Sequence, residues 1–184
     1  MTTIAVLMPH LPGRDRGLVD EAVASVHAQT RKPDQFILEP DVEHTGCAAT
    51  LNRALEKVTC DWVAQLADDD FFLPEHLAVL EAHIGKADVI YPDCLEYGAT
   101  PGVGGDYDAE RLTSANYIPG GGSLIRTAAA RMVGGWCRRG DPDWHPFEDW
   151  VMWKRLRDAG CNFVHVPQKT WVYRFGVHQT GGQA

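Results

Sequence analysis

Three adjacent aspartates, Asp68, Asp69 and Asp70, are the strongest chemical signal in the sequence, because they directly follow the apolar segment 62–66. That segment has the composition of a buried strand, and ligands of parallel α/β sheets collect beyond the carboxyl ends of the strands. Three neighbouring carboxylates repel one another unless a cation neutralises them. Hard oxygen ligands at this density suit Mg²⁺ or Mn²⁺, which in turn suit a phosphate-bearing substrate. The alternative is a solvated acidic turn that caps the next helix.

Glu148 and Asp149 form a second acidic pair, at the start of a helix predicted over residues 148–159. Carboxylates at a helix N-terminus often serve only as caps and as partners of the helix dipole. If the pair faces the same site as the three aspartates, one carboxylate could act as a general base on an acceptor hydroxyl. Periodicity alone leaves both roles open.

Further polar residues follow the second predicted strand and open the next predicted helix. Glu39 and Asp41 could bind ribose hydroxyls or a base edge, or they could be exposed loop acids. Gly46, Asn52 and Arg53 belong to the start of the helix, where backbone N–H groups could meet a diphosphate.

One histidine beyond the last predicted strand, His178, could be a metal ligand or an incidental residue. The eight histidines include no HExxH-like spacing. The sequence also has no GxSxG elbow, no P-loop and no GxGxxG after the first strand. These absences exclude the common hydrolase, NTPase and dinucleotide-binding classes.

An α/β fold is needed to position these residues. In the first half, apolar strand patterns alternate with amphipathic helix patterns: strands at 4–8, 35–38, 62–66 and 88–91, and helices at 18–29, 47–58 and 74–84. Successive strand–helix units imply crossover connections and a mostly parallel central sheet flanked by helices. The second half is less regular: a glycine-rich stretch at 98–122, strands at 123–126, 163–166 and 170–173, and helices at 127–133 and 148–159.

Length and composition set the outer limits. The chain has 184 residues, of which 45% are hydrophobic and 23% are charged, so it has the composition of a globular protein and is not disordered. No internal repeat or linker interrupts the pattern, and we therefore expect residues 1–184 to form a single domain. No apolar run approaches the roughly 18–20 residues of a membrane span. The N-terminus lacks the features of a signal peptide.

Cysteine usage and charge indicate the compartment and the partners. Five widely spaced cysteines without a CxxC pair predict reduced thiols in a cytoplasmic protein. The formal net charge of −8 argues against nonspecific nucleic-acid binding, which requires a basic footprint. The charge is uneven, because residues 39–70 hold eight acidic and two basic residues, whereas residues 151–174 hold five basic residues and one acidic residue.

Taken in order, the segments resemble the family 2 glycosyltransferases of the GT-A fold, a Rossmann-like architecture. Residues 18–30 (LVDEAVASVHAQT) are similar to a family helix that reads ALxSVLAQT. Residues 62–74 (WVAQLADDDFFLP) are similar to its strand, DxD-type motif and Leu-Pro. The resemblance continues through residues 6–9, 46–55 (GCAATLNRAL), 88–93 (DVIYPD), 120–126 (GGGSLIR), 133–136 (VGGW) and 148–156 (EDWVMWKRL). The order and spacing of these segments together are specific to the family.

The resemblance implies sugar transfer from a nucleoside-diphosphate sugar, with a UDP-sugar as the first expectation, to an acceptor hydroxyl with inversion. It implies Asp149 as the catalytic base, with Glu148 as its neighbour. It implies Mn²⁺ or Mg²⁺ bound by residues drawn from Asp68, Asp69, Asp70 and His178. Donor binding falls to Pro9, Glu39, Asp41, Asn52, Arg53, Asp68, Gly121 and Gly122. The DxD spacing selects Asp68 and Asp70, whereas alignment on the following Leu-Pro selects Asp69 and Asp70, and both remain open.

Two departures from the family pattern affect the donor site. The usual Asp-Asp-Gly-Ser after the second strand is Glu-Pro-Asp-Val here, at residues 39–42. The frequent arginine before Asn52 is Leu51, so a diphosphate contact is either missing or supplied by Arg53 or Arg14.

Two other functions remain open: a nucleotide-sugar-binding module without turnover, and a nucleotidyltransferase, for which residues 10–17 (HLPGRDRG) offer a sparse basic loop. The sequence does not select the acceptor among a glycan, a lipid-linked sugar, a protein, a small molecule and a modified nucleobase in DNA.

Overall fold

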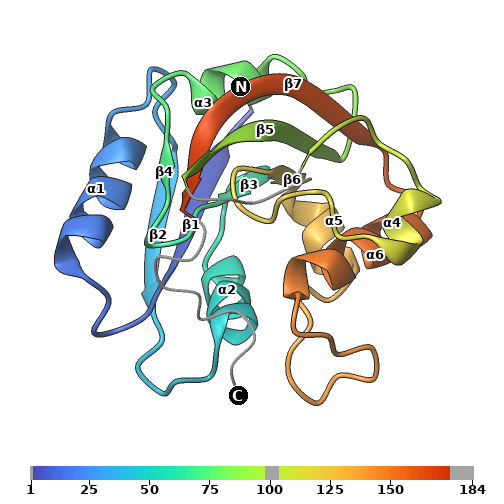
Figure 1. Cartoon of the computed structure of the whole chain (residues 1–184), viewed down its shortest axis with the longest axis horizontal. Coiled ribbons are helices and arrows are strands. Elements are labelled where there is room, and N and C mark those ends of the chain that lie inside the picture. Colours follow the sequence, from blue (N-terminus) through green and yellow to red (C-terminus); the bar gives the residue numbers. More distant parts are fainter. Residues whose placement is uncertain (1, 98–103, 175–184) are drawn as a thin grey trace.

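The computed structural model describes residues 2–97 and 104–174, which form a curled seven-stranded sheet with helices on both faces (Figure 1). The strands are β1 (Ile4–His10), β2 (Gln35–Pro40), β3 (Trp62–Gln65), β4 (Phe71–Phe72), β5 (Val89–Tyr97), β6 (Leu124–Arg126) and β7 (Phe163–Arg174). The helices are α1 (Arg16–His27), α2 (Cys47–Glu56), α3 (His76–Glu81), α4 (Arg111–Ser114), α5 (Thr127–Met132) and α6 (Glu148–Asp158).

The strand order is β2-β1-β3-β6-β5-β7-β4, and the sheet is mixed. Strand β1 pairs in parallel with β2 and β3, and β5 pairs in parallel with β7. The pairings β3–β6, β5–β6 and β4–β7 are antiparallel. The predicted α/β sheet flanked by helices is therefore confirmed, but it is not purely parallel, because β6 enters between β3 and β5 in the opposite direction.

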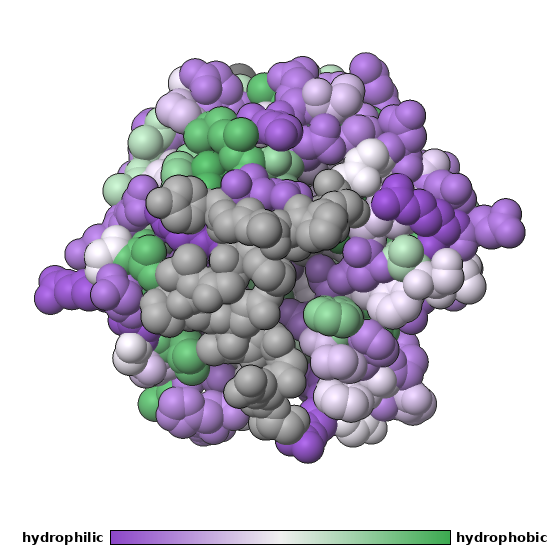
Figure 2. Space-filling view, viewed as in Figure 1, coloured by the Kyte–Doolittle hydropathy of each residue, from purple (hydrophilic) through white to green (hydrophobic). Residues whose placement is uncertain are grey.

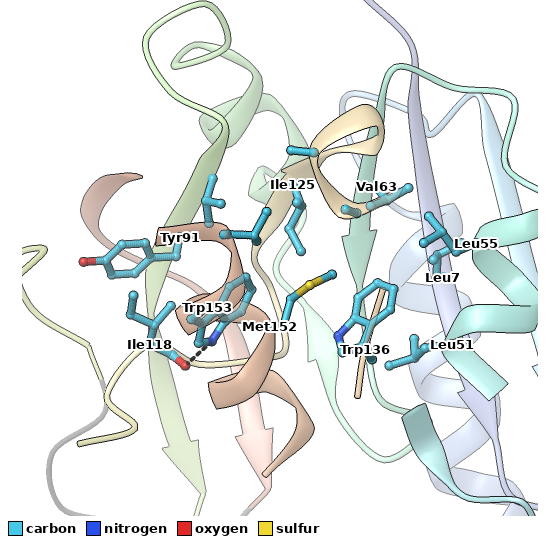
Figure 3. Packing of buried hydrophobic residues seen from close by; sticks show 14 of the residues in the cluster. Leu7, Leu51, Leu55, Val63, Tyr91, Ile118, Ile125, Trp136, Met152 and Trp153 are labelled. Carbon is cyan, nitrogen blue, oxygen red and sulfur yellow. Dashed lines mark hydrogen bonds between the residues drawn. The ribbon is translucent and has the colours of Figure 1, made fainter. Parts of the chain in front are cut away.

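Each face of the sheet has its own hydrophobic core. On one face, side chains of α1 and α3 such as Val26 and Leu80 belong to the same hydrophobic cluster as Val6 of β1. On the other face, α2, α5 and α6 cover the sheet, and Figure 3 shows Trp136 beside Leu51 of α2 and Trp153 of α6 beside Ile118, with Met152 between the two tryptophans. Because β1 and β3 carry buried residues on both faces, residues 4–8 and 62–64 are all apolar and do not alternate with polar residues.

The C-terminal strand differs from the prediction. The sequence predicts two strands, at 163–166 and 170–173, whereas β7 runs without interruption from Phe163 to Arg174. Its pairing with β5 shifts register between Pro92 and Cys94, where the partner of Asp93 is Lys169. A bulge absorbs Pro167, whose ring nitrogen cannot donate to the ladder. The short elements β4 and α4 were not predicted, because two and four residues carry no periodicity.

The face of the molecule in Figure 2 is mainly hydrophilic, with hydrophobic residues gathered in small separate patches. Among the described residues, no helix has the length and apolar character needed to cross a membrane. The large hydrophobic side chains exposed at the surface are Leu38, Val42, Leu95, Met132, Trp144 and Phe147.

Candidate functional site

The predicted site residues gather where β1, β2 and β3 end. These strands are parallel, and their register pairs Pro9 with Glu39 and Leu7 with Gln65. The segments that follow the strands therefore emerge at one edge of the sheet, as ligand-binding segments do in such folds. We call this edge, together with the N-termini of α2 and α6, the candidate site.

Asp68 lies at the centre of the candidate site and is almost completely buried, with 3% of its side chain exposed. Its Oδ2 accepts hydrogen bonds from the backbone N–H of Leu11 and lies 2.9 Å from Nδ1 of His10. Its Oδ1 accepts a bond of 2.9 Å from Nε of Arg14. Both oxygens of Asp68 are thus bound by the loop that follows β1.

The other two aspartates have different surroundings. Oδ2 of Asp69 lies 3.2 Å from the guanidinium of Arg14. Asp70 is buried and accepts a 2.8 Å hydrogen bond from the backbone N–H of Arg174. Burial outweighs this hydrogen bond and raises the pKa of Asp70 to about 8. The three neighbouring carboxyls therefore differ in their hydrogen-bond and ion-pair partners.

The predicted metal ligands do not form a prepared cation site in the described part of the chain. There, no group of three or more His, Cys, Asp or Glu side chains is arranged to hold a metal ion. Both oxygens of Asp68 already have protein partners, Oδ1 with Arg14 and Oδ2 with His10 and Leu11. The remaining predicted ligand, His178, lies outside the described residues. The Asp68-centred set therefore does not fit a metal in this arrangement.

Glu39, near the end of β2, and Asp41, directly after β2, are buried acids and not exposed loop residues. Glu39 forms ion pairs with Lys57 and Arg53. Asp41 accepts hydrogen bonds of 2.8 Å from the backbone N–H groups of Thr45 and Gly46. Although its burial acts in the opposite direction, these bonds lower the pKa of Asp41. Asp41 therefore fixes the loop that leads into α2.

Asn52 connects α2 to the segment before α6. Its Nδ2 donates to the carbonyl of Trp136 at 2.8 Å, and its Oδ1 accepts from the Trp136 N–H at 2.9 Å. A Cβ on Gly135 would lie 2.2 Å from this Oδ1, so glycine is required there. Arg53, one residue further on, donates to the hydroxyls of Thr45 and Thr50.

Asp149 lies in the first turn of α6. Its Oδ1 accepts hydrogen bonds from Trp150 N–H at 2.7 Å and from Nδ2 of Asn116 at 3.1 Å. Desolvation, followed by the neighbouring charge of Glu148, raises the pKa of Asp149 to about 7. The carboxyl thus takes part in capping the helix, and it also has the proton affinity of a general base near neutral pH.

The glycines at 120–122 pass directly over two side chains of the site. A Cβ on Gly120 would lie 2.9 Å from both Cβ and Oδ2 of Asp149. A Cβ on Gly121 or on Gly122 would lie 2.6 Å from the ring of Trp171. Only residues without a side chain allow this close approach.

Two tryptophans of α6 bind the chain that leads into this glycine segment, and the end of β3 binds the segment itself. Nε1 of Trp150 donates to the carbonyl of Leu112 at 2.8 Å, and Nε1 of Trp153 donates to that of Ile118 at 3.0 Å, as drawn in Figure 3. The N–H of Gly122 donates to the carbonyl of Gln65 at 2.9 Å. The glycines, Asp149 and the end of β3 are therefore one connected unit.

Cys47 has an exposed side chain at the N-terminal end of α2. Although its side chain is exposed, the surrounding protein and then the charges of Glu148, Asp149 and Asp68 raise its pKa well above the ordinary value. Cys47 is the first residue of α2.

Sequence reasoning missed several residues of this site. His10, Asn116 and Trp171 were not predicted, and Arg14 was considered only as a possible diphosphate contact. No local motif marks these residues, because each acquires its role from a partner at least 33 positions away, as Asn116 does from Asp149. For Arg14, the only signal in the sequence was a basic residue in the loop that follows the first predicted strand.

Comparison with known proteins agrees with this architecture. The structure is similar to S. aureus TarS, with a TM-score of 0.69 at 12% identity over 94% of this chain. It is similar to residues 1–349 of TarS in complex with UDP-GlcNAc (TM-score 0.73, 11% identity, 100% of this chain) and with UDP (0.68, 12%, 94%). The chain spans 37% of the first of these proteins and 61% and 60% of the other two. At such identities the likeness establishes the fold, and the predicted GT-A architecture is confirmed.

The family follows from the sequence match. No protein of curated function matches the chain by sequence. The family model described as "Glycosyl transferase family 2" matches residues 15–118, more than half of the chain. This match includes α1, α2 and the aspartates after β3, where the sequence resemblance was found. The chain belongs to glycosyl transferase family 2.

Proposed function

We propose that residues 1–184 form one catalytic domain that transfers a sugar, with inversion, from a nucleoside-diphosphate sugar to an acceptor hydroxyl. The observation that carries the proposal is Asp149, an acid in the first turn of α6 with a pKa of about 7. A base with a pKa near the working pH is the most effective proton acceptor. Asn116 supports the same role, because its hydrogen bond orients the carboxylate.

The reaction proceeds in one displacement. Asp149 accepts the proton of the acceptor hydroxyl while that oxygen forms a bond to the anomeric carbon of the donor. The bond between the anomeric carbon and the phosphate oxygen breaks, and its electron pair leaves with the nucleoside diphosphate. Attack on the side opposite the leaving group inverts the anomeric configuration. Glu148, the neighbour of Asp149, supports the base by raising its pKa.

The donor proposal rests on family membership and on the arrangement of the sheet edge. TarS has been crystallised with UDP-GlcNAc and with UDP, which makes these compounds the first probes for this chain. Pro9, Glu39 and Asp41 flank the nucleoside end of the proposed site, at the ends of the paired strands β1 and β2. Gly121 and Gly122 flank the sugar end, next to the segment that contacts Asp149. Asn52 and Arg53 hold α2 between these two ends.

The metal, the compartment and the acceptor complete the proposal. Mn²⁺ or Mg²⁺, as the family resemblance implies, has no part in the reaction scheme above, because the oxygens of Asp68 are already bound by protein groups. A cytoplasmic location is supported by the five cysteines, all of which are free thiols. The acceptor is a hydroxyl compound whose class the site does not select.

The test is the variant Asp149→Asn. It keeps the shape and the hydrogen bond from Asn116 but removes the base, so we expect transfer to fall by about 10²- to 10⁴-fold while UDP binding is retained. The control is Asp158→Asn, on the same helix, where the carboxylate is exposed and paired only with Arg157 among the described groups. Full activity in both variants would eliminate Asp149 as the base.

Assays on the same protein distinguish two alternative functions from sugar transfer. A binding module without turnover would show thermal stabilisation by UDP but no sugar release or transfer with any acceptor. A nucleotidyltransferase would release pyrophosphate from a nucleoside triphosphate. This last function is less well supported, because Arg14, in the basic loop at residues 10–17, is bound to Asp68 and Asp69.

A further inference from the structure

Arg14 lies where a cation would have to lie to neutralise the aspartates after β3. Its Nε is 2.9 Å from Oδ1 of Asp68, and another guanidinium nitrogen is 3.2 Å from Oδ2 of Asp69. One planar group therefore bridges two consecutive carboxylates. An arginine side chain suits this geometry, because its donors are fixed in a fork and its charge persists at any working pH.

Burial makes this ion pair different from a surface salt bridge. Only 7% of the Arg14 side chain and 3% of the Asp68 side chain are exposed. A buried carboxylate needs a compensating charge, and removal of one partner from such a pair leaves an uncompensated charge. By contrast, Arg16, two residues further along, has 93% of its side chain exposed and lies 3.6 Å from Asp20.

A divalent cation would have to displace this arrangement. Mg²⁺ requires ligand oxygens at about 2.0–2.1 Å in nearly octahedral geometry. Oδ1 of Asp68 points at Arg14, and its Oδ2 is held by Leu11 N–H and Nδ1 of His10. A cation bound to Asp68 and Asp69 would therefore meet the guanidinium at close range, and like charges repel.

We propose that Arg14 takes the place of a divalent cation at Asp68 and Asp69, so that this chain binds its donor nucleotide without a metal. The inference rests on the proposed donor site. In this role Arg14 is a positioning residue: it neutralises the two aspartates and fixes the loop after β1 against the start of the segment after β3. Asp68 and Asp69 then bind the guanidinium of an arginine and not a metal ion.

The experiment compares the wild-type chain with Arg14→Gln and with the matched control Arg16→Gln. Mn²⁺ alone is titrated into each protein and followed by calorimetry and thermal unfolding. UDP affinity is then measured in EDTA and in MnCl₂. For the wild type and for Arg16→Gln we expect no Mn²⁺ binding and equal UDP affinity in both buffers. For Arg14→Gln, whose aspartates lack a counter-charge, we expect Mn²⁺ binding and a preference for MnCl₂ of about tenfold in UDP affinity.

The outcomes separate this inference from the proposed function. Wild-type UDP binding that is about tenfold or more tighter in MnCl₂ than in EDTA overturns the inference, as does Mn²⁺ binding by the wild type that Asp68→Asn abolishes. If Arg14→Gln does not fold, the UDP affinity of the wild type in EDTA and in MnCl₂ still tests the inference. A wild type that binds neither UDP nor Mn²⁺ contradicts the proposed donor site but leaves the role of Arg14 at the aspartates supported.

Discussion

Replacement of Gly120 by alanine is the sharpest test of how the glycine segment positions the base. Alanine is compatible with the backbone at this position, because Gly120 does not have the positive φ found at Gly122. The new methyl group would lie 2.9 Å from Cβ and Oδ2 of Asp149, whereas ordinary contacts begin at 3.4 Å. Asp149 or the segment must therefore move by about half an ångström.

The expected result is loss of turnover with donor binding preserved. Displacement of a reacting group by about 1 Å can lower a rate about 10²-fold, so we expect the kcat of Gly120→Ala to fall by about 10- to 100-fold. Overpacking should lower the free energy of unfolding by about 1–3 kcal/mol. Sugar transfer from UDP-GlcNAc, UDP affinity and thermal unfolding measure the three quantities.

A double-mutant cycle isolates the contact between the two positions. In an Asp149→Gly background, residue 149 has no side chain for the new methyl group to meet. The stability penalty of Gly120→Ala should therefore be smaller there than in the wild type. If the penalty is the same in both backgrounds, or if Gly120→Ala leaves kcat unchanged, the steric argument is refuted.

Two further predictions concern pH and the link between α2 and α6. Because only the carboxylate form of Asp149 accepts a proton, kcat/KM should fall about tenfold per pH unit below a pKa of about 7. The variant Asn116→Ala removes a hydrogen bond that favours the carboxylate, so the acidic limb of the profile should move to higher pH. A profile that is flat from pH 5 to 8 (about two units below and one above that pKa) would contradict the assignment. Asn52→Ala should lower the free energy of unfolding by about 1–3 kcal/mol by leaving both backbone groups of Trp136 unpaired. Reduced UDP affinity with unchanged stability would instead make Asn52 a direct donor contact.

Local patterns were sufficient to predict most of the framework. The apolar segments of β1 and β3 and the amphipathic pattern of α2 each predicted the correct element, because burial imposes a composition on every residue of such a segment. The direction of β6 and the continuity of β7 were not predictable in this way. Both depend on which strand each segment meets, and pairing partners leave no local periodicity.

The sequence by itself determined that the chain is a family 2 glycosyltransferase domain with acids at the end of its third strand. Only the tertiary structure decided what those acids contact. His10 and Asp68 are 58 positions apart, Asn116 and Asp149 are 33 apart, and Arg174 and Asp70 are 104 apart. A motif specifies residue types along the chain, whereas the charge state and the partners of a carboxylate depend on burial and on side chains that distant segments bring within hydrogen-bonding distance. For that reason the aspartate cluster, which in the sequence predicts a metal site, forms an ion pair with Arg14 through Asp68 and Asp69 in the folded chain.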